Sequence, residues 1–146
     1  MSGDSSNTTN HNIEVLYSVG FKKIGNTSIF KRDKDFIISP TVSAGTTGNY
    51  WFDIRNVNID KLQKSENPLM LVRIVPDMFI LIKLADFMPM LSKNTMRERK
   101  NSGEVWGFHT SFNANKTRGK IISSADSTLT YTSPILEKDA VVIQIQ

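Results

Sequence analysis

The chain has no cysteine among its 146 residues. Disulfide bonds and zinc sites built from thiolates are therefore excluded, and this composition suits a reducing compartment such as the cytoplasm. No apolar run approaches the roughly 20 residues that a membrane-spanning helix needs. We therefore predict a cytoplasmic protein with no membrane partner.

Histidine is scarce as well, with only 2 residues. His11 lies in a polar N-terminal segment and His109 in a predicted strand, so their positions do not indicate a metal site. Neither histidine has a nearby serine or cysteine in the pattern of a catalytic triad. A general base at His109 is one alternative, because an imidazole titrates near neutral pH.

The overall composition, with 39% hydrophobic and 22% charged residues, is typical of one globular domain. We predict a disordered tail over residues 1–12, which carry no apolar residue after Met1, and a single globular domain over residues 13–146. The formal net charge of +4 is compatible with a polyanionic partner.

The apolar pattern predicts an α+β fold, with a mixed, mostly antiparallel central sheet, a few short helices and a strand-rich C-terminal part. Helices are expected from residue 13 to a Schellman ending at Gly20 and Phe21, and over residues 57–63 and 86–92. An almost continuously apolar hairpin, residues 69–75 and 78–84, is the expected centre of the core. Further strands are expected over residues 27–31, 35–39, 49–55, 104–112, 120–123, 128–132 and 140–145.

The strand over residues 49–55 is the most informative segment. Side chains alternate across a strand, so Tyr50, Phe52 and Ile54 share one face. Trp51, Asp53 and Arg55 share the other face and place an aromatic ring, an acid and a base in a row. This second face is a candidate site, and the alternative is an exposed Asp53–Arg55 ion pair of about 0–1 kcal/mol.

The predicted order of elements is a helix, three strands that end in Asp53-Ile54-Arg55, a second helix and an apolar strand. This order resembles that of the PD-(D/E)XK (restriction-endonuclease-like) nucleases. The resemblance spans residues 13–91. It implies that Asp35 and Asp53 are catalytic and hold magnesium, whose ligands are oxygen atoms. Arg55 would occupy the place of the family's catalytic lysine, and this is a departure, because a guanidinium cannot act as a base.

Basic residues cluster in two predicted connections, beside the aromatic strand that contains Trp106 and Phe108. Cations and nearby aromatic rings suit phosphate contact and base stacking. We therefore predict nucleic acid, DNA rather than RNA, as the partner. The predicted contact residues are Trp51, Lys93, Arg97, Arg99, Lys100, Lys116, Arg118 and Lys120.

The leading hypothesis is thus a nucleic-acid-binding domain that resembles a metal-dependent nuclease. One alternative is a protein-interaction module or homo-oligomer, because residues 141–146 predict an uncharged edge strand that invites strand addition. Another is a small-molecule site on the Trp51 face. The small-residue loop over residues 41–48 is a candidate binding loop beside that face, and a plain surface loop is its alternative.

Overall fold

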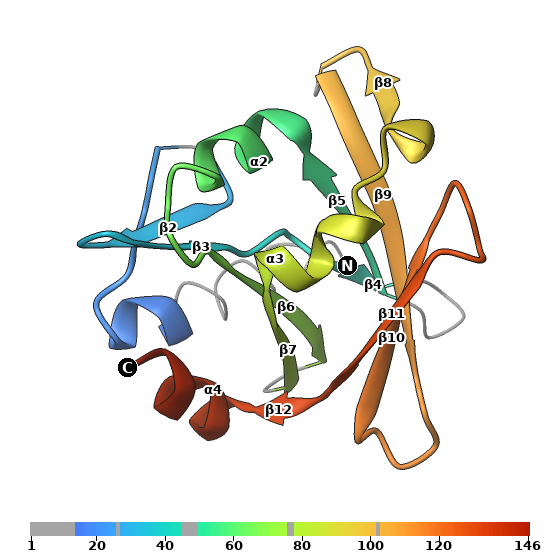
Figure 1. Cartoon of the computed structure of the whole chain (residues 1–146). Helices are drawn as coiled ribbons and strands as arrows, with labels where there is room; N and C mark the ends of the chain where they lie inside the picture. The colour runs from blue at the N-terminus through green and yellow to red at the C-terminus, as the bar shows by residue number, and fades with distance from the viewer. Residues whose placement is uncertain (1–13, 26, 45–49, 76–77, 102) are drawn as a thin grey trace.

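A computed structural model describes residues 14–25, 27–44, 50–75, 78–101 and 103–146. Within these residues the chain forms short helices and mostly antiparallel strands, which confirms the α+β class. The strands divide between two sheets, whereas the sequence predicts one central sheet (Figure 1). The predicted tail, residues 1–12, lies outside the described residues.

The first sheet is built around the predicted apolar hairpin. In order across the sheet, its strands are β1 (Lys22–Lys23), β2 (Ile29–Arg32), β3 (Asp35–Ile38), β6 (Leu69–Val75), β7 (Met78–Lys83) and β12 (Leu136–Glu137). β3 and β6 are parallel, and the other neighbours are antiparallel. Adjacent residues Leu71 and Val72 of β6 are both fully buried, because both faces of this strand are covered.

The second sheet is centred on β9 and is antiparallel throughout. Its strands are β11 (Thr130–Pro134), β10 (Arg118–Ser123), β9 (Gly103–Phe112), β5 (Tyr50–Arg55) and β4 (Ser43–Ala44), with β8 (Arg97–Arg99) also paired to β9. β5 pairs with one edge of β9, and β8 and β10 pair with successive parts of the other edge. β9 therefore holds residues from three other strands in fixed register.

The helices are short and lie in the connections and near the ends of the described chain. They are residues 14–18, α2 (Asn56–Leu62), α3 (Leu84–Phe87) and α4 (Lys138–Ile145), with 3₁₀ turns at Met88–Met90 and Lys93–Thr95. α2 confirms the helix predicted over residues 57–63. The helix predicted over residues 86–92 is confirmed only in part: α3 ends at Phe87 and a 3₁₀ turn continues to Met90, because Pro89 has no N–H to continue an α-helix.

Two apolar clusters hold these layers together. The larger cluster joins the two sheets and includes Phe52 of β5, Val72 of β6 and Phe108 of β9. The second cluster lies on the opposite side of the first sheet, where it joins Leu16 of the N-terminal helix and Val141 of α4. Figure 1 shows α4 beside the N-terminal helix at the lower left. The larger cluster therefore buries one face of the second sheet.

The two sheets approach closely where β10 passes β7. A Cβ atom on Gly119 of β10 would lie 2.6 Å from Cδ1 of Ile80 on β7. Real Cβ atoms do not come so close to a neighbouring carbon, so any larger residue at this corner would require Ile80 to shift. The chain also crosses between the sheets nearby, because β11 leads directly into β12.

The predicted Schellman ending of the N-terminal helix is confirmed. The Phe21 N–H donates to the Leu16 carbonyl at 2.9 Å, and the Gly20 N–H donates to the Tyr17 carbonyl at 3.1 Å. Gly20 has a φ of +95°, which glycine adopts at little cost. Leu16 and Phe21 pack in the same buried cluster, as expected.

The strand predicted over residues 140–145 is wrong, because these residues form most of α4. Val141 and Ile145, one helical turn apart, are 0% and 3% exposed, whereas Ile143 between them is 70% exposed. A strand would place all three side chains on one face. The exposed terminal strand on which the homo-oligomer hypothesis depends is therefore not present.

Two of the predicted connections contain strands. Residues 93–103 include β8, and residues 116–120 include the start of β10, so Arg97, Arg99, Arg118 and Lys120 lie in the second sheet. The predicted loop over residues 41–48 contains β4, and its residues 45–48 lie outside the described chain. None of the helices in the described ranges is long and apolar enough to cross a membrane.

Candidate functional site

One face of the second sheet is polar and exposed, and we call it the outer face. On β5, Phe52 and Ile54 are buried in the core while Trp51, Asp53 and Arg55 are exposed, which confirms the predicted alternation. Residues directly opposite each other in paired strands share a face, so the strand registers extend the outer face beyond β5. It also contains Arg97, Arg99, Val105, Gly107, His109, Ser111, Arg118, Lys120, Ile122, Thr130 and Thr132.

An aromatic platform lies on the outer face where β5 pairs with β9. Trp51 of β5 is opposite His109 of β9, and their ring centroids are 4.7 Å apart at an interplanar angle of 40°. Trp51 is 44% exposed, so part of the indole is available for a further stacking partner. The His109 Nδ1 atom is buried and has no hydrogen-bond partner within the described residues. The contact between these rings fixes the position of the exposed indole.

An ion pair crosses the outer face beside this platform. Arg99 Nη1 of β8 donates to Asp53 Oδ2 of β5 at 2.9 Å. The strand between them is β9, and a Cβ atom on its Gly107 would lie 3.3 Å from Asp53 Oδ1, so glycine leaves room for the carboxylate. Both side chains are about half exposed, at 50% for Arg99 and 40% for Asp53, and such a pair contributes about 0–1 kcal/mol. Asp53 thus pairs with Arg99 of β8.

The outer face has a surplus of positive charge. Asp53 is the only acid on it among the described residues, and its charge is balanced by Arg99. The other predicted cations lie in turns at the ends of the strands, where Lys116 holds its ammonium 5.6 Å from the Phe112 ring centroid. The exposed cations on the face are Arg55, Arg97, Arg99, Arg118 and Lys120, and those in the turns are Lys93, Lys100 and Lys116.

The two carboxylates that the nuclease resemblance pairs are on different sheets. Asp53 is on β5 of the second sheet, and Asp35 begins β3 of the first sheet, where it bonds to Arg32 at 3.3 Å. No group of three potential metal ligands occurs within the part of the chain that the structure describes. A magnesium ion prefers several converging oxygen ligands. Two separated carboxylates, each paired with an arginine, do not fit such an ion.

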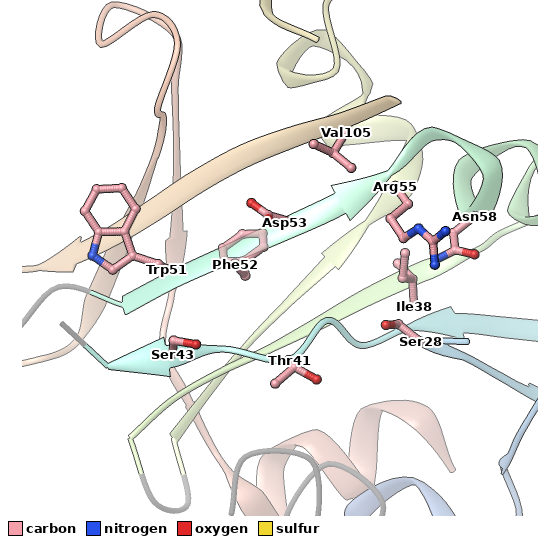
Figure 2. A pocket seen from close by; sticks show the side chains of 10 residues that line it. All are labelled: Ser28, Ile38, Thr41, Ser43, Trp51, Phe52, Asp53, Arg55, Asn58 and Val105. Atoms are coloured by element: carbon pink, nitrogen blue, oxygen red, sulfur yellow. The ribbon is translucent and has the colours of Figure 1, made fainter. Parts of the chain in front are cut away.

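A pocket of about 340 Å³ opens beside the Trp51 end of the outer face (Figure 2). It forms because the chain moves from the first sheet to the second between β3 and β4. β4 pairs with β5 only at Tyr50 and Trp51, so the rest of that edge of β5 has no strand beside it in the described chain. The pocket is lined by Ser28, Ile38, Thr41, Ser43, Trp51, Phe52, Asp53, Arg55, Asn58 and Val105.

The sequence predicts only part of this site. Trp51, Asp53, Arg55 and the cations of β8 and β10 share one face, while Asp35 lies elsewhere. Gly107 and Asn58 were not predicted, and neither was the stacking of His109. Gly107 and His109 alternate with the aromatic residues of β9, so the same period-2 pattern could have placed them on the outer face. Nothing local in the sequence marks Asn58.

Two groups with shifted pKa values lie off the outer face. Burial, together with the negative charge of Asp86, raises the pKa of Tyr131 above its usual value. Hydrogen bonds from the Thr128 hydroxyl and backbone N–H lower the pKa of Asp126. Each of these shifts has a local structural cause, so neither indicates an acid–base pair on this face.

No protein-family model matches the chain, and neither the curated proteins nor the solved structures include a significant match. The functional argument therefore depends on the geometry of the outer face and its pocket.

Proposed function

We propose that this protein binds nucleic acid through the outer face of its second sheet. The observation that carries the proposal is the half-exposed Trp51 ring, 4.7 Å from the His109 ring on a face whose cations outnumber its acids. Exposed aromatic rings on a sheet stack nucleobases, and surrounding cations contact phosphates. This arrangement supports single-stranded nucleic acid in particular, because an unpaired base offers its ring face to Trp51.

The first test is fluorescence anisotropy with labelled single-stranded and duplex DNA at two salt concentrations. If phosphate contacts contribute, log affinity should fall linearly with log salt, by about 0.7 per phosphate neutralised on a single strand. Replacing Arg97 and Lys120 with alanine should reduce this slope by about 1.4, since two cations are removed. The Lys34→Ala/Lys64→Ala variant changes net charge equally but alters exposed residues away from the outer face. An equal effect from both variants would refute a specific interface.

The second test addresses the aromatic platform. Trp51→Ala should weaken binding to single-stranded DNA by about 1–3 kcal/mol, the usual contribution of one stacked base. Tyr17→Ala is the matched control, because Tyr17 is also an exposed aromatic residue, at 49%, but belongs to the N-terminal helix. Equal losses in the two variants, or no loss in Trp51→Ala, would contradict the proposal.

The same assay with magnesium and with a chelator tests hydrolysis. The separation of Asp35 and Asp53 favours binding without metal-dependent cleavage, so we expect intact DNA under both conditions. Cleavage that requires magnesium and is lost in Asp53→Ala would restore the nuclease hypothesis. If light scattering shows a dimer, and this dimer does not bind DNA at low salt, the result would instead support a protein-interaction module.

A further inference from the structure

The pocket beside Trp51 differs in chemistry from the flat part of the outer face. Ile38, Phe52 and Val105 line it but are at most 3% exposed, so the exposed apolar surface of the pocket comes mainly from Trp51, which is 44% exposed. Its polar groups include the Asn58 side chain, which is only 5% exposed although asparagine is usually a surface residue. An amide buried beside a cavity offers both a donor and an acceptor to whatever enters. The pocket thus combines an exposed aromatic ring with a hydrogen-bonding group.

The pocket extends along β5, and its two ends differ. Figure 2 shows Trp51 at one end of β5 and Arg55 at the other, with Asn58 next to Arg55. Trp51 and Arg55 are four positions apart on the strand, so about 13 Å separates these ends at ~3.3 Å per residue. A single planar ring cannot contact both ends. A polymer can do so, with one unit at Trp51 and the next unit in the pocket.

A nucleobase matches this pocket in size and chemistry. It is a flat ring with apolar faces and a polar edge, and the volume of about 340 Å³ is near the lower limit of ligand pockets, ~300–1,000 Å³.

We propose that the pocket binds one unpaired nucleobase, next in the strand to the base that stacks on Trp51. This inference depends on the proposed function and specifies its substrate: nucleic acid with at least one base outside a duplex. The Asn58 amide would hydrogen-bond the polar edge of the base. A base that is already unpaired enters without the cost of leaving a duplex, so unpaired sites should be preferred.

The test compares a fully paired DNA duplex with the same duplex containing a one-nucleotide bulge of 2-aminopurine. We expect the bulged duplex to bind about tenfold more tightly, as one added base contact typically produces. The fluorescence of 2-aminopurine should change on binding, because the base moves to a new environment. Thr41→Trp should abolish this preference, because Thr41 is exposed at the pocket and a large side chain there would fill it.

Gln63→Trp is the control, since Gln63 is exposed at the end of α2, outside both the outer face and the pocket, and it should keep the preference. Equal affinity for both duplexes, or a preference that survives Thr41→Trp, would overturn the pocket assignment. If binding is still salt-dependent in that case, the proposed function stands. Absence of binding to any DNA at low salt would overturn both proposals. Binding of a free nucleoside that Thr41→Trp abolishes, without a preference for the bulge, would also overturn the polymer assignment.

Discussion

Replacing Gly119 with alanine should destabilise the protein through one contact. The new methyl group would lie 2.6 Å from Ile80 Cδ1 and 3.5 Å from Ile74 Cδ1, at the corner where the sheets meet. Ile80 is 0% exposed, so its Cδ1 atom can move away only by displacing the side chains packed around it. Overpacking of this kind costs about 1–3 kcal/mol. Replacing a glycine in a strand stabilises by about 0.5–1 kcal/mol, so the net loss should be about 0–2.5 kcal/mol.

Urea denaturation can measure this loss in a double-mutant cycle. Ile80→Val removes the Cδ1 atom that clashes and alone should cost about 0.5–1.5 kcal/mol. If the clash is the cause, the double variant Gly119→Ala/Ile80→Val should be more stable than the sum of the single effects predicts, by about 0.5 kcal/mol or more. Gly107→Ala is the control, because its 3.3 Å contact is with the exposed Asp53 carboxylate, which can move. Additive effects at Gly119 and Ile80, or an equal loss in Gly107→Ala, would refute the reasoning.

Two further predictions concern other parts of the fold. Val141→Asp should unfold the protein, since it places an unpaired charge at a fully buried position, whereas Ile143→Asp at 70% exposure should change stability by less than about 0.5 kcal/mol. Comparable damage from both substitutions, seen by circular dichroism, would indicate a strand in place of α4. The raised pKa of Tyr131 means that the folded state keeps its proton while the unfolded state loses it, so stability present at neutral pH should fall as the pH rises above 10, the ordinary tyrosine value. Tyr131→Phe should flatten this alkaline fall in thermal unfolding, and an unchanged fall would exclude Tyr131 as its cause.

Features with a local cause were predictable from the sequence. The two faces of β5 follow from alternation, and the apolar hairpin of β6 and β7 follows from its composition. The turn at Gly20 and Phe21 also follows from local hydrogen bonding and one nearby apolar contact. In each case the residues that determine the structure are close together in the chain.

Features set by distant partners were not predictable in this way. The β-branched residues of α4 favour a strand by propensity, but burial of Val141 and Ile145 against the first sheet favours a helix, and packing overrides propensity. β8 has the sequence Arg-Glu-Arg without any apolar residue, and it is a strand because β9 pairs with it. The division into two sheets has the same origin, because no local pattern shows that β5 pairs with β9.

The central position of β9 also affects how the chain folds. β5 can pair with β9 only after a loop containing the whole β6–β7 hairpin has closed, and that closure costs entropy before any contact forms. Long-range strand pairing of this kind slows folding. An intermediate without β9 has neither the Trp51–His109 contact nor the Asp53–Arg99 pair, because β9 supplies His109 and holds β8 in register. Binding through the outer face would therefore occur only after the second sheet has folded completely.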